Sequence, residues 1–309
     1  MKVIILFFVN LLVKLRILTP IRVARLKFWY KLHRWPDFEH PEDINEKINW
    51  LKFYGDTSRW PMLADKYAVR EYVRECGLEE CLIPLIGKWD SVDDIDWEAL
   101  PRQFVMKCNN GSGDVVVCKN KEELNKEETL RYFRKQIDKK YGVLTGETHY
   151  ALIKPCIIAE EILAPNPTKG GVKGTGGLID YKIWCFNGKP AFIVCYSNRH
   201  DKYDCEIGVY DTDWNSHPEF LRYSSHYKKE KEPVKRPLCL QQMLDIASRL
   251  SRGITQVRVD LYEVAEKVYF GEMTLTSSGG YMAHFTQDFL DKMGELTKLL
   301  ILFFCPTDL

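Results

Sequence analysis

Apolar positions recur along the chain in two patterns. One has the spacing of about 3.6 residues that is typical of a helix, and the other consists of short runs that are typical of strands. Three segments repeat their apolar residues at nearly the helical spacing, so each predicts a helix with one buried face. These segments are residues 62–77, 238–253 and 285–300. Gly77 and Gly253 end the first two segments, as expected of residues that stop a helix. The first helix would therefore carry Asp65 and Lys66 in its opening turns.

Shorter runs of β-branched and aromatic residues predict strands. The strand segments are residues 104–107, 115–118 and 156–163, followed by two hairpins at 180–199 and 257–274. Asn187 and Gly188 would form the turn of the first hairpin, because both residues tolerate the positive φ of a tight turn. Helices mixed with strand hairpins in this order predict an α+β fold rather than a doubly wound parallel sheet.

One long loop interrupts this pattern. Residues 165–177, with the sequence PNPTKGGVKGTGG, are polar and rich in glycine. Such a composition is typical of a flap over a site rather than of a packed element. We expect this flap to close over a substrate.

The composition of the chain narrows its class. With 309 residues, of which 45% are hydrophobic and 13% aromatic, the chain can bury the core of one large domain or of two packed ones. Lys and Arg number 44 and Asp and Glu 43, so a net charge of +1 creates no general attraction to nucleic acid. The 10 cysteines form no CxxC pair and no zinc-type cluster with histidine, which indicates reduced thiols in a cytoplasmic protein.

The first twenty residues, MKVIILFFVNLLVKLRILTP, are strongly apolar and permit three interpretations. Lys14 and Arg16 interrupt the run before it reaches the roughly 18 residues that a spanning helix needs. No small-residue cleavage site follows before Pro20. A helix packed on the body of the protein, an amphipathic helix in contact with the inner membrane face, and an export signal all stay open.

Acidic and basic side chains meet in the second predicted hairpin. Because side chains alternate along a strand, Arg258 and Asp260 share one face of their strand. By the same rule Phe270, Glu272 and Thr274 share one face of the next strand. Two carboxylates and a hydroxyl beside a guanidinium would suit Mg²⁺ on a nucleotide phosphate, since this ion prefers oxygen ligands. A salt-bridged hairpin, in which Arg258 or a lysine neutralises Asp260, would have the same pattern.

A glycine-rich turn follows Lys107. In its sequence, NNGSGD, glycines let backbone N–H groups approach phosphate oxygens, and the lysine supplies a positive charge. The sequence lacks the GxxxxGK[ST] pattern of a P-loop, and strands are expected on both sides of the turn. A cover over phosphates is therefore expected, with an ordinary surface hairpin as the alternative.

Other charged residues could belong to the same site. Glu160 and Glu161 end an apolar strand that would bury at least one of them, so one is expected to meet a ligand or a basic partner. Lys66 could equally be a solvated lysine, and Lys182 could pair with Asp180 or Glu161.

The order of these features resembles the ATP-grasp superfamily, and specifically the TupA-like ATP-grasp family associated with teichuronopeptide and polysaccharide biosynthesis. The similarity extends from the segment KINWLKFYGD, after Glu46, nearly to the C-terminus. It implies an ATP-grasp fold in which two antiparallel-sheet subdomains hold a nucleotide. Residues 58–309 would form this domain, with a nucleotide-covering part at about 100–165 and a metal-phosphate part at about 178–309. Residues 1–57 would be an N-terminal helical segment.

The resemblance also implies roles for particular residues. The matching motifs are ADKYAVREYV and DYKIWCFNGKP for phosphate-facing lysines, FVMKCNNGSGD for the phosphate cover and IIAEEIL for the adenine hinge. By this match the nucleotide-binding residues are Lys66, Lys107, Asn110, Gly111, Ser112, Gly113, Glu160, Glu161, Leu163 and Lys182. Arg258 would be the catalytic residue that stabilises the intermediates, and Asp260, Glu272 and Thr274 would hold Mg²⁺. Thr274 stands where many members of the superfamily have asparagine, which leaves the number of metal ions open.

The implied reaction is an ATP- and Mg²⁺-dependent ligation. A carboxylate attacks the γ-phosphate of ATP to give an acyl phosphate, and an amine then displaces phosphate to form an amide. Positioning and charge stabilisation would do most of the catalysis. The family context implies a uronic acid or an acidic amino acid as the carboxylate, in a surface polysaccharide pathway, and no nucleic acid partner.

Three other activities compete with the ligase interpretation. Asp211-Thr212-Asp213 is a D-x-D, the acid pair with which glycosyltransferases hold a metal on a nucleotide sugar. However, YDTDWN also predicts a polar turn, and no nucleotide-binding βαβ unit precedes it. An ATP-binding scaffold without ligase activity and a small-molecule phosphotransferase would use most of the same residues, whereas a protein kinase would need an HRD-like loop.

Overall fold

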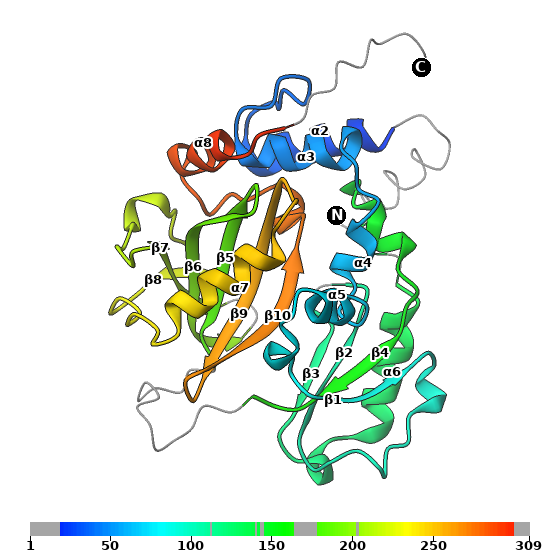
Figure 1. Ribbon diagram of the computed structural model, residues 1–309. Helices are drawn as coiled ribbons and strands as arrows, with labels where there is room; N and C mark the ends of the chain where they lie inside the picture. The colour runs from blue at the N-terminus through cyan, green and yellow to red at the C-terminus, as the bar shows by residue number, and fades with distance from the viewer. Residues whose placement is uncertain are drawn as a thin grey trace.

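The computed structural model describes residues 19–111, 113–139, 141–142, 145–163, 178–201 and 204–299 (Figure 1). These residues form two sheets with mostly antiparallel strand pairs and covering helices, which confirms the α+β prediction. Ser112, the expected flap at 165–177 and the apolar residues 1–18 lie outside the described residues. Within the part that is described, no helix is both long and apolar enough to cross a membrane.

The larger sheet has six strands in the order β10-β9-β5-β6-β7-β8. Its strands are β5 (Asp180–Phe186), β6 (Lys189–Asp201), β7 (Asp204–Asp211), β8 (Tyr227–Lys229), β9 (Gln256–Val264) and β10 (Lys267–Thr274). Both predicted hairpins are confirmed, as β5–β6 and β9–β10. Strand β9 also pairs with β5, so the two hairpins lie side by side in the sheet. Asn187 and Gly188 adopt φ values of 50° and 79°, as the first hairpin's turn requires.

The two faces of the larger sheet are covered differently. Helix α7 (Leu240–Leu250), which the sequence predicts, packs its buried side chains on one face against Val257, Val259 and Leu261 of β9. On the other face, α3 (Ile44–Tyr54) and α8 (Gln287–Leu296) cover one end, where they join a second hydrophobic cluster with strand residues. Because side chains alternate along a strand, Arg258 and Asp260 of β9 project from the face opposite α7.

The smaller sheet has four strands in the order β1-β4-β2-β3. They are β1 (Leu85–Trp89), β2 (Phe104–Cys108), β3 (Val115–Cys118) and β4 (Ile157–Glu160). The strand–turn–strand predicted around NNGSGD is confirmed as β2 and β3. Helix α6 (Lys126–Ile137) covers one face through Phe133, which packs with Phe104 and Met106. Strand β1 is absent from the sequence prediction, because its half-buried residues show no clear alternation.

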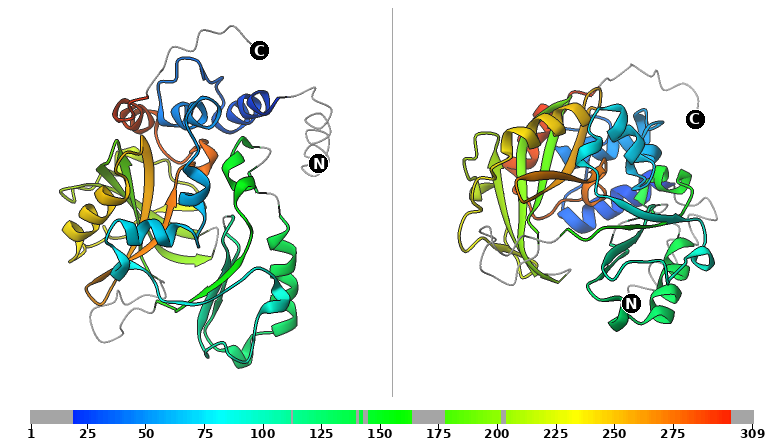
Figure 2. Two further views of the ribbon diagram at one scale, coloured as in Figure 1. Left: turned by 45° about the vertical axis from the view of Figure 1, so that its right-hand side comes forward. Right: turned by 60° about the horizontal axis from the view of Figure 1, so that its bottom comes forward.

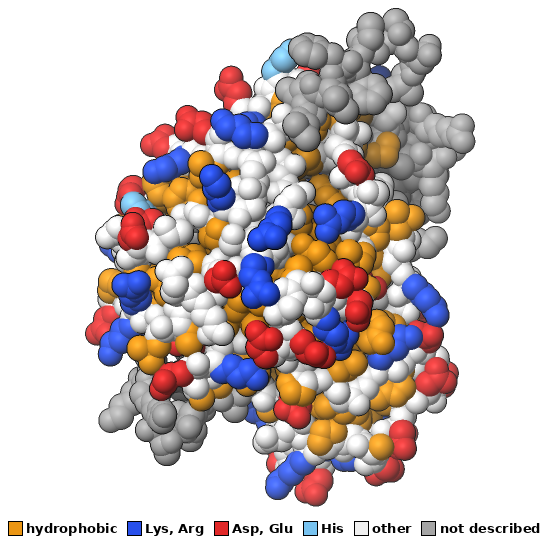
Figure 3. All heavy atoms as spheres, viewed as in Figure 1, with side chains coloured by type: hydrophobic (Ala, Val, Ile, Leu, Met, Phe, Trp, Pro, Cys, Tyr) orange, Lys and Arg blue, Asp and Glu red, His pale blue; other side chains and the backbone are white. Residues whose placement is uncertain are grey.

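The remaining helices connect and cap the two sheets. They are α2 (Pro20–Leu32), α4 (Trp60–Ala64) and α5 (Val69–Glu75), with short 3₁₀ turns η1 (Glu79–Cys81), η2 (Val92–Asp94), η3 (Lys121–Glu123), η5 (Thr148–Leu152), η6 (Pro218–Phe220) and η7 (Ser277–Gly279). Figure 2 shows the sheets side by side, with α2, α3 and α8 gathered at one end. Acidic and basic side chains are interspersed over the face seen in Figure 3, as the balanced composition leads one to expect.

The single helix predicted at residues 62–77 is wrong. The structure has two short helices, α4 and α5, separated by a turn that begins at Asp65. The Asp65 Oδ1 atom accepts hydrogen bonds from the backbone N–H groups of Tyr67 (2.8 Å) and Ala68 (3.2 Å). An aspartate that binds its own backbone in this way competes with the helix, which therefore breaks. Lys66 consequently lies in a turn before α5 rather than within a helix.

Helix α3 is held by polar contacts to the C-terminal part of the chain. Asn45 accepts a hydrogen bond from the Met282 N–H at 2.9 Å, and Asn49 donates one to the Gly280 carbonyl at 3.0 Å. Both asparagines are fully buried. Because buried amides need such partners, these bonds fix the turn after β10 against α3.

Candidate functional site

A cavity of about 510 Å³ has walls from both sheets. Arg258, Glu272 and Thr274 line it from β9 and β10 of the larger sheet. Lys66 and Gly111 line it from the turn before α5 and from the turn between β2 and β3. The fold thus brings together five of the residues that the sequence analysis selected.

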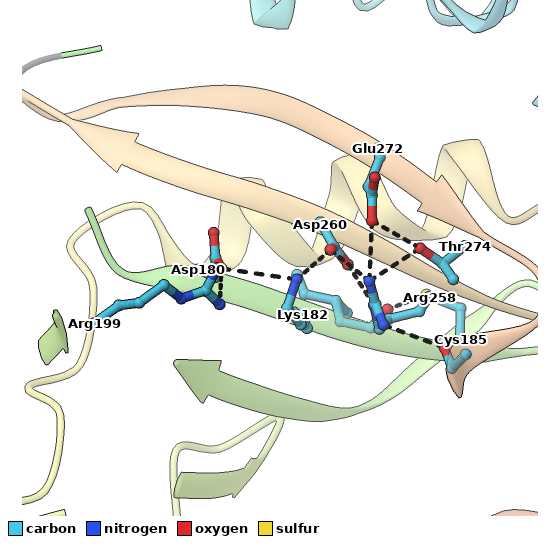
Figure 4. A network of polar contacts seen from close by, with 10 residues as sticks. Asp180, Lys182, Cys185, Arg199, Arg258, Asp260, Glu272 and Thr274 are labelled. Carbon is cyan, nitrogen blue, oxygen red and sulfur yellow. Dashed lines mark hydrogen bonds and ion pairs between the residues drawn. The ribbon is translucent and has the colours of Figure 1, made fainter. Parts of the chain in front are cut away.

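Arg258 is the centre of the polar network in this cavity (Figure 4). Its Nε and Nη2 atoms donate to the two carboxylate oxygens of Asp260 at 2.6 and 2.7 Å. Nη2 also donates to Glu272 Oε1 at 3.1 Å and lies 3.0 Å from Thr274 Oγ1. Burial by itself would lower the pKa of Arg258, but the two carboxylates outweigh it and raise the pKa above its ordinary value. The guanidinium therefore stays charged at any physiological pH.

Asp260 lies behind Arg258, away from the cavity. Its side chain is only 3% exposed, and Lys182 of β5 forms a second ion pair with it. Lys182 also lies 3.8 Å from Asp180, so one of the pairings considered from the sequence is observed, while Glu161 is not its partner. Burial would raise the pKa of Asp260, but Arg258 and Lys182 hold it below its ordinary value. Both oxygens of Asp260 are thus occupied by cations.

The prediction that Phe270 shares a strand face with Glu272 and Thr274 is wrong. A β-bulge lies between Phe270 and Glu272, where Phe270 is opposite Leu261 and Glu272 is opposite Asp260. The extra residue reverses the alternation, as a bulge does. Phe270 consequently packs in the core on the α7 side, while Glu272 and Thr274 face the cavity.

Lys66 joins the glycine-rich turn to the cavity. Its backbone N–H donates to the Asn109 carbonyl at 3.2 Å, and its ammonium group donates to the Gly111 carbonyl. Burial lowers the pKa of the Lys66 ammonium below its ordinary value, against the opposing effect of the Glu272 carboxylate. Lys66 and Glu272 line the same cavity, so the lysine and the acid belong to one site.

Glu160 and Lys107 form a buried ion pair on the face of the smaller sheet opposite α6. Lys107 Nζ lies 2.6 Å from Glu160 Oε2, and Arg70 of α5 binds Glu160 Oε1 at 2.9 Å. Glu160 is 4% exposed, whereas Glu161 is exposed. The expectation that the strand buries one acid against a basic partner is therefore confirmed.

The other nucleotide-binding candidates do not line the cavity among the described residues. Asn110 is buried, Gly113 adopts a φ of 84°, and Leu163 is half-buried at the last described position before residues 164–177. These residues lie next to the glycine-rich turn and β4 in the chain, so a role in nucleotide binding stays a prediction for each of them.

Several cavity residues were not found from the sequence. Lys27 of α2, Glu147 and Tyr150 line the cavity, although they lie far from the selected motifs in the chain. Ser278 and Gly279 line it as well, and both adopt positive φ values, of 50° and 67°. The pair of glycines after Ser278 was a local signal for this turn, whereas no periodic pattern marks Lys27 or Glu147.

A buried lysine connects two segments of the cavity wall. Lys52 is 7% exposed, and its Nζ atom donates to the carbonyls of Thr145 at 2.8 Å and Gly279 at 2.9 Å. Burial lowers the pKa of Lys52 to about 7, and the Glu147 carboxylate opposes this effect only in part. The two carbonyl contacts of Lys52 therefore join α3 to both segments.

The donor chemistry of this wall suits Mg²⁺ in part. Glu272 is the more accessible acid, with a side chain 38% exposed, and Thr274 Oγ1 lies 3.1 Å from its Oε1. Carboxylate and hydroxyl oxygens are ligands that this ion accepts. Within the described residues, no group of three or more His, Cys, Asp or Glu side chains is placed to hold a metal ion. Asp260, the third predicted magnesium ligand, differs from Glu272 and Thr274 because Arg258 and Lys182 already bind its oxygens.

The D-x-D sequence lies away from this cavity. Asp211 ends β7, and its oxygens accept hydrogen bonds from the backbone of Asp213 (2.9 Å) and from both the backbone and the side chain of Asn215 (2.8 Å each). Asp213 is exposed. The predicted polar turn is therefore confirmed, and the first acid stabilises that turn.

Comparison with solved structures gives distant matches. D-alanine–D-alanine ligase from Bacillus anthracis, complexed with ATP, has 14% identity and a TM-score of 0.37, and the match covers 69% of this chain and 54% of that one. The Helicobacter pylori D-alanine–D-alanine ligase has 14% identity, a TM-score of 0.40 and coverages of 84% and 69%. N5-carboxyaminoimidazole ribonucleotide synthetase from Thermus thermophilus has 13% identity, a TM-score of 0.41 and coverages of 76% and 52%.

Sequence comparison is more specific. The present chain spans about half the length of the first of these structures, and none of the curated proteins matches it. The family model described as TupA-like ATPgrasp matches residues 46–298, which is most of the chain. That range includes Lys66, the glycine-rich turn, Arg258 and Glu272. The chain belongs to the TupA-like ATP-grasp family.

Proposed function

We propose that the chain is an ATP-dependent ligase that joins a carboxylate to an amine through an acyl phosphate. The observation that carries this proposal is the cavity wall on which Arg258, Glu272 and Thr274 converge, with Lys66 lining the same cavity. Fixed cations around one cavity are what phosphoryl transfer requires, because the reaction develops charge on phosphate oxygens.

Each charged group has a distinct part in this proposal. Lys66, beside the Gly111 carbonyl, binds the nucleotide phosphates. Arg258 is the catalytic residue, and it stabilises the negative charge of the acyl phosphate and of the tetrahedral intermediate that follows. The two bonds from Asp260 hold the guanidinium in one orientation, so that little reorganisation is needed during the reaction.

Glu272 and Thr274 are the residues that would hold magnesium from the cavity side. The ion would neutralise part of the charge on the ATP phosphates. Asp260 supports the same site by orienting Arg258, and Lys182 keeps the Asp260 carboxylate ionised.

The smaller sheet provides the nucleotide cover in this proposal. Lys107 would lie over the phosphates, and the end of β4 at Glu160 and Glu161 would be the adenine hinge, with Leu163 beside it. The Arg70–Glu160–Lys107 ion pairs support this arrangement, because they fix the strands that carry the cover. Residues 100–165 would then act as the covering part, and 178–309 as the metal-phosphate part.

A glycosyltransferase is less well supported. The first acid of the D-x-D sequence already accepts hydrogen bonds within its own turn, and the turn does not contribute to the large cavity. Thermal unfolding with MgATP and with a UDP-sugar plus Mn²⁺ tests the two classes, since a ligand that binds the native state raises its stability. We expect MgATP to raise the melting temperature and the UDP-sugar to leave it unchanged. The reverse result would remove the ligase proposal.

The carboxylate substrate in this proposal is a uronic acid or an acidic amino acid of a surface polysaccharide pathway in the cytoplasm. All cysteines in the described residues are free thiols, which fits a reducing compartment. A screen of uronic acids with amines for release of ADP and phosphate tests the reaction. ADP release that needs both the acid and the amine would support ligation, whereas release with neither would indicate only ATP hydrolysis.

Peripheral contact with the inner membrane face is the further part of the proposal. Trp29, Tyr30 and Trp35, in or just after α2, have exposed fractions of 47%, 62% and 61%. Aromatic side chains beside basic residues are typical of a surface that lies in the lipid headgroup region. Cosedimentation with vesicles containing phosphatidylglycerol, compared for the wild type and a Trp29→Ala/Trp35→Ala variant, tests the contact. Equal recovery of both proteins with the vesicles would contradict it.

A further inference from the structure

One end of the cavity carries charged residues that the phosphate chemistry does not use. Lys27 and Glu147 both line the cavity, and they contact Tyr281 and Thr276, which follow Glu272 and Thr274 in the chain. Lys27 belongs to α2, which precedes the residues 46–298 that match the family model. The N-terminal helix therefore contributes a cation to a cavity that is otherwise built from the matched part of the chain.

Lys27 is placed to bind an anion. Its Nζ atom lies 4.5 Å above the ring of Tyr281, which orients the ammonium group. Burial lowers the pKa of the Lys27 ammonium, and the Glu147 carboxylate opposes this effect in part. In the described part of the chain, no carboxylate lies within 4.0 Å of this ammonium. Its charge is thus available to a ligand.

Glu147 is a carboxylate, and it too forms no ion pair among the described side chains. It is 6% exposed, and its oxygens accept hydrogen bonds from the hydroxyls of Thr276 (2.7 Å) and Thr145. Hydroxyl groups bring no charge, and a carboxylate can accept about four hydrogen bonds. Among the described side chains, Glu147 has no ion pair within 4.0 Å. It can therefore accept a further bond from a cationic or amine group.

Contacts with one segment of the chain, residues 272–281, give the order of the charges along the cavity. Glu272 Oε1 lies 3.1 Å from Thr274 Oγ1 at the phosphate end. Glu147 accepts its hydrogen bond from Thr276, two residues further along this segment. Lys27 lies over the ring of Tyr281, five residues beyond Thr276. The order of the charges along this segment is therefore Glu272, then Glu147, then Lys27.

We infer that this end of the cavity binds an amino acid as the amine substrate, with its amino group beside Glu147 and its carboxylate on Lys27. The inference rests on the proposed ligase function, because only a ligation requires an amine near the phosphate end. An amino acid carries both an amine and a carboxylate, and an acid and a lysine that line one cavity can bind one group each. The amine, held by the acid nearer the reaction centre, then points toward the activated carboxylate.

A matched pair of lysine variants tests this inference. Lys27→Met removes the cation from the cavity, while Lys31→Met removes an exposed lysine one turn further along the same helix. The assay is ADP release with MgATP, a panel of uronic acids, and two sets of amines. The first set is the common amino acids, and the second is the corresponding amines without a carboxylate, such as ethylamine for alanine. Lys27→Arg tests whether the charge is sufficient.

The expected result is a selective loss of amino acid binding. Lys27→Met should raise the KM for the amino acid about 10- to 100-fold, as for the loss of a hydrogen bond to a charged group. The KM for ATP should stay within about two-fold, and Lys27→Arg should recover most of the binding. A melting-temperature shift caused by the amino acid with MgADP should disappear in Lys27→Met and persist in Lys31→Met. That readout does not depend on turnover.

Three results would overturn the inference. The first is an unchanged KM for the amino acid in Lys27→Met, and the second is equal use of amines that lack a carboxylate. The third is turnover with simple amines and with none of the amino acids, which would leave the ligase proposal intact. ADP release with no acid and amine pair of any kind would instead remove the ligase proposal and this inference with it.

Discussion

Replacing Glu160 with glutamine is expected to destabilise the protein more than removing either cation that surrounds it. Glu160 binds Arg70 at 2.9 Å and Lys107 at 2.6 Å, and the three side chains are 6%, 7% and 13% exposed. Glutamine has nearly the same shape but no charge, so Glu160→Gln leaves two cations beside each other without a counter-ion. Removing one partner of a buried ion pair costs about 3–5 kcal/mol, mainly because the remaining charge is poorly solvated.

The cost can be measured against a variant that leaves the acid paired. In Lys107→Met the Glu160 carboxylate still binds Arg70, so we expect a smaller loss, about 1 kcal/mol. The 8 tryptophans of the chain provide a fluorescence signal for urea unfolding. In a thermal scan the Glu160→Gln loss corresponds to a fall of about 6–20 °C in the melting temperature.

Two outcomes would refute this reasoning. If Glu160→Gln unfolds at the wild-type urea concentration, the carboxylate does not compensate the two cations in the folded state. If Lys107→Met costs as much as Glu160→Gln, the packing of the lysine stem matters more than the charges.

Three further predictions concern the cavity. The pKa of Lys52 is about 7 in the folded protein and about 10.5 in the unfolded chain, so the unfolded state binds more protons between these pH values. The free energy of unfolding should therefore rise with pH in that window, by at most about 1.4 kcal/mol per pH unit. Urea unfolding at several pH values checks this slope, which Lys52→Met should remove. Glu272→Gln should abolish ADP release while its melting temperature stays near that of the wild type, with the exposed-site variant Glu80→Gln as a fully active control; wild-type turnover in Glu272→Gln would eliminate the proposed metal site. Arg258→Lys should lower kcat about 100-fold or more, because lysine cannot form the paired bonds to Asp260, and an undiminished kcat would remove Arg258 from catalysis.

The hairpins of the larger sheet were predictable because local chemistry determines them. Asn187 and Gly188 accept the φ values that the turn imposes, and strand alternation correctly placed Arg258 and Asp260 on one face. Alternation failed one strand later, because the bulge before Glu272 adds a residue that no composition rule reveals. A two-residue period is reliable only where the strand pairing is regular.

Other features depend on contacts that a single sequence does not record. The helix expected at 62–77 breaks because the Asp65 side chain accepts a hydrogen bond from the backbone of Tyr67. Aspartate also occurs within helices, so its presence in the sequence does not reveal the break. Lys27 and Glu147 line one cavity only because the fold brings α2 to it. Their separation of more than a hundred positions carries no periodic signal, so no window of the sequence could have joined them.

The contacts of α3 have a consequence for how the protein is made. Asn45, Asn49 and Lys52 bind backbone groups of residues 279–282, and these residues are more than two hundred positions away. A ribosome synthesises α3 before these residues, so the buried amides of the helix find their partners only after residues 279–282 have emerged. Until then the helix exposes a face that is meant for the interior, and contacts of such long range form late and slowly. The cavity wall at Gly279 therefore assembles well after α3 has been synthesised, and a nascent chain that ends before Gly279 should not be able to retain ATP.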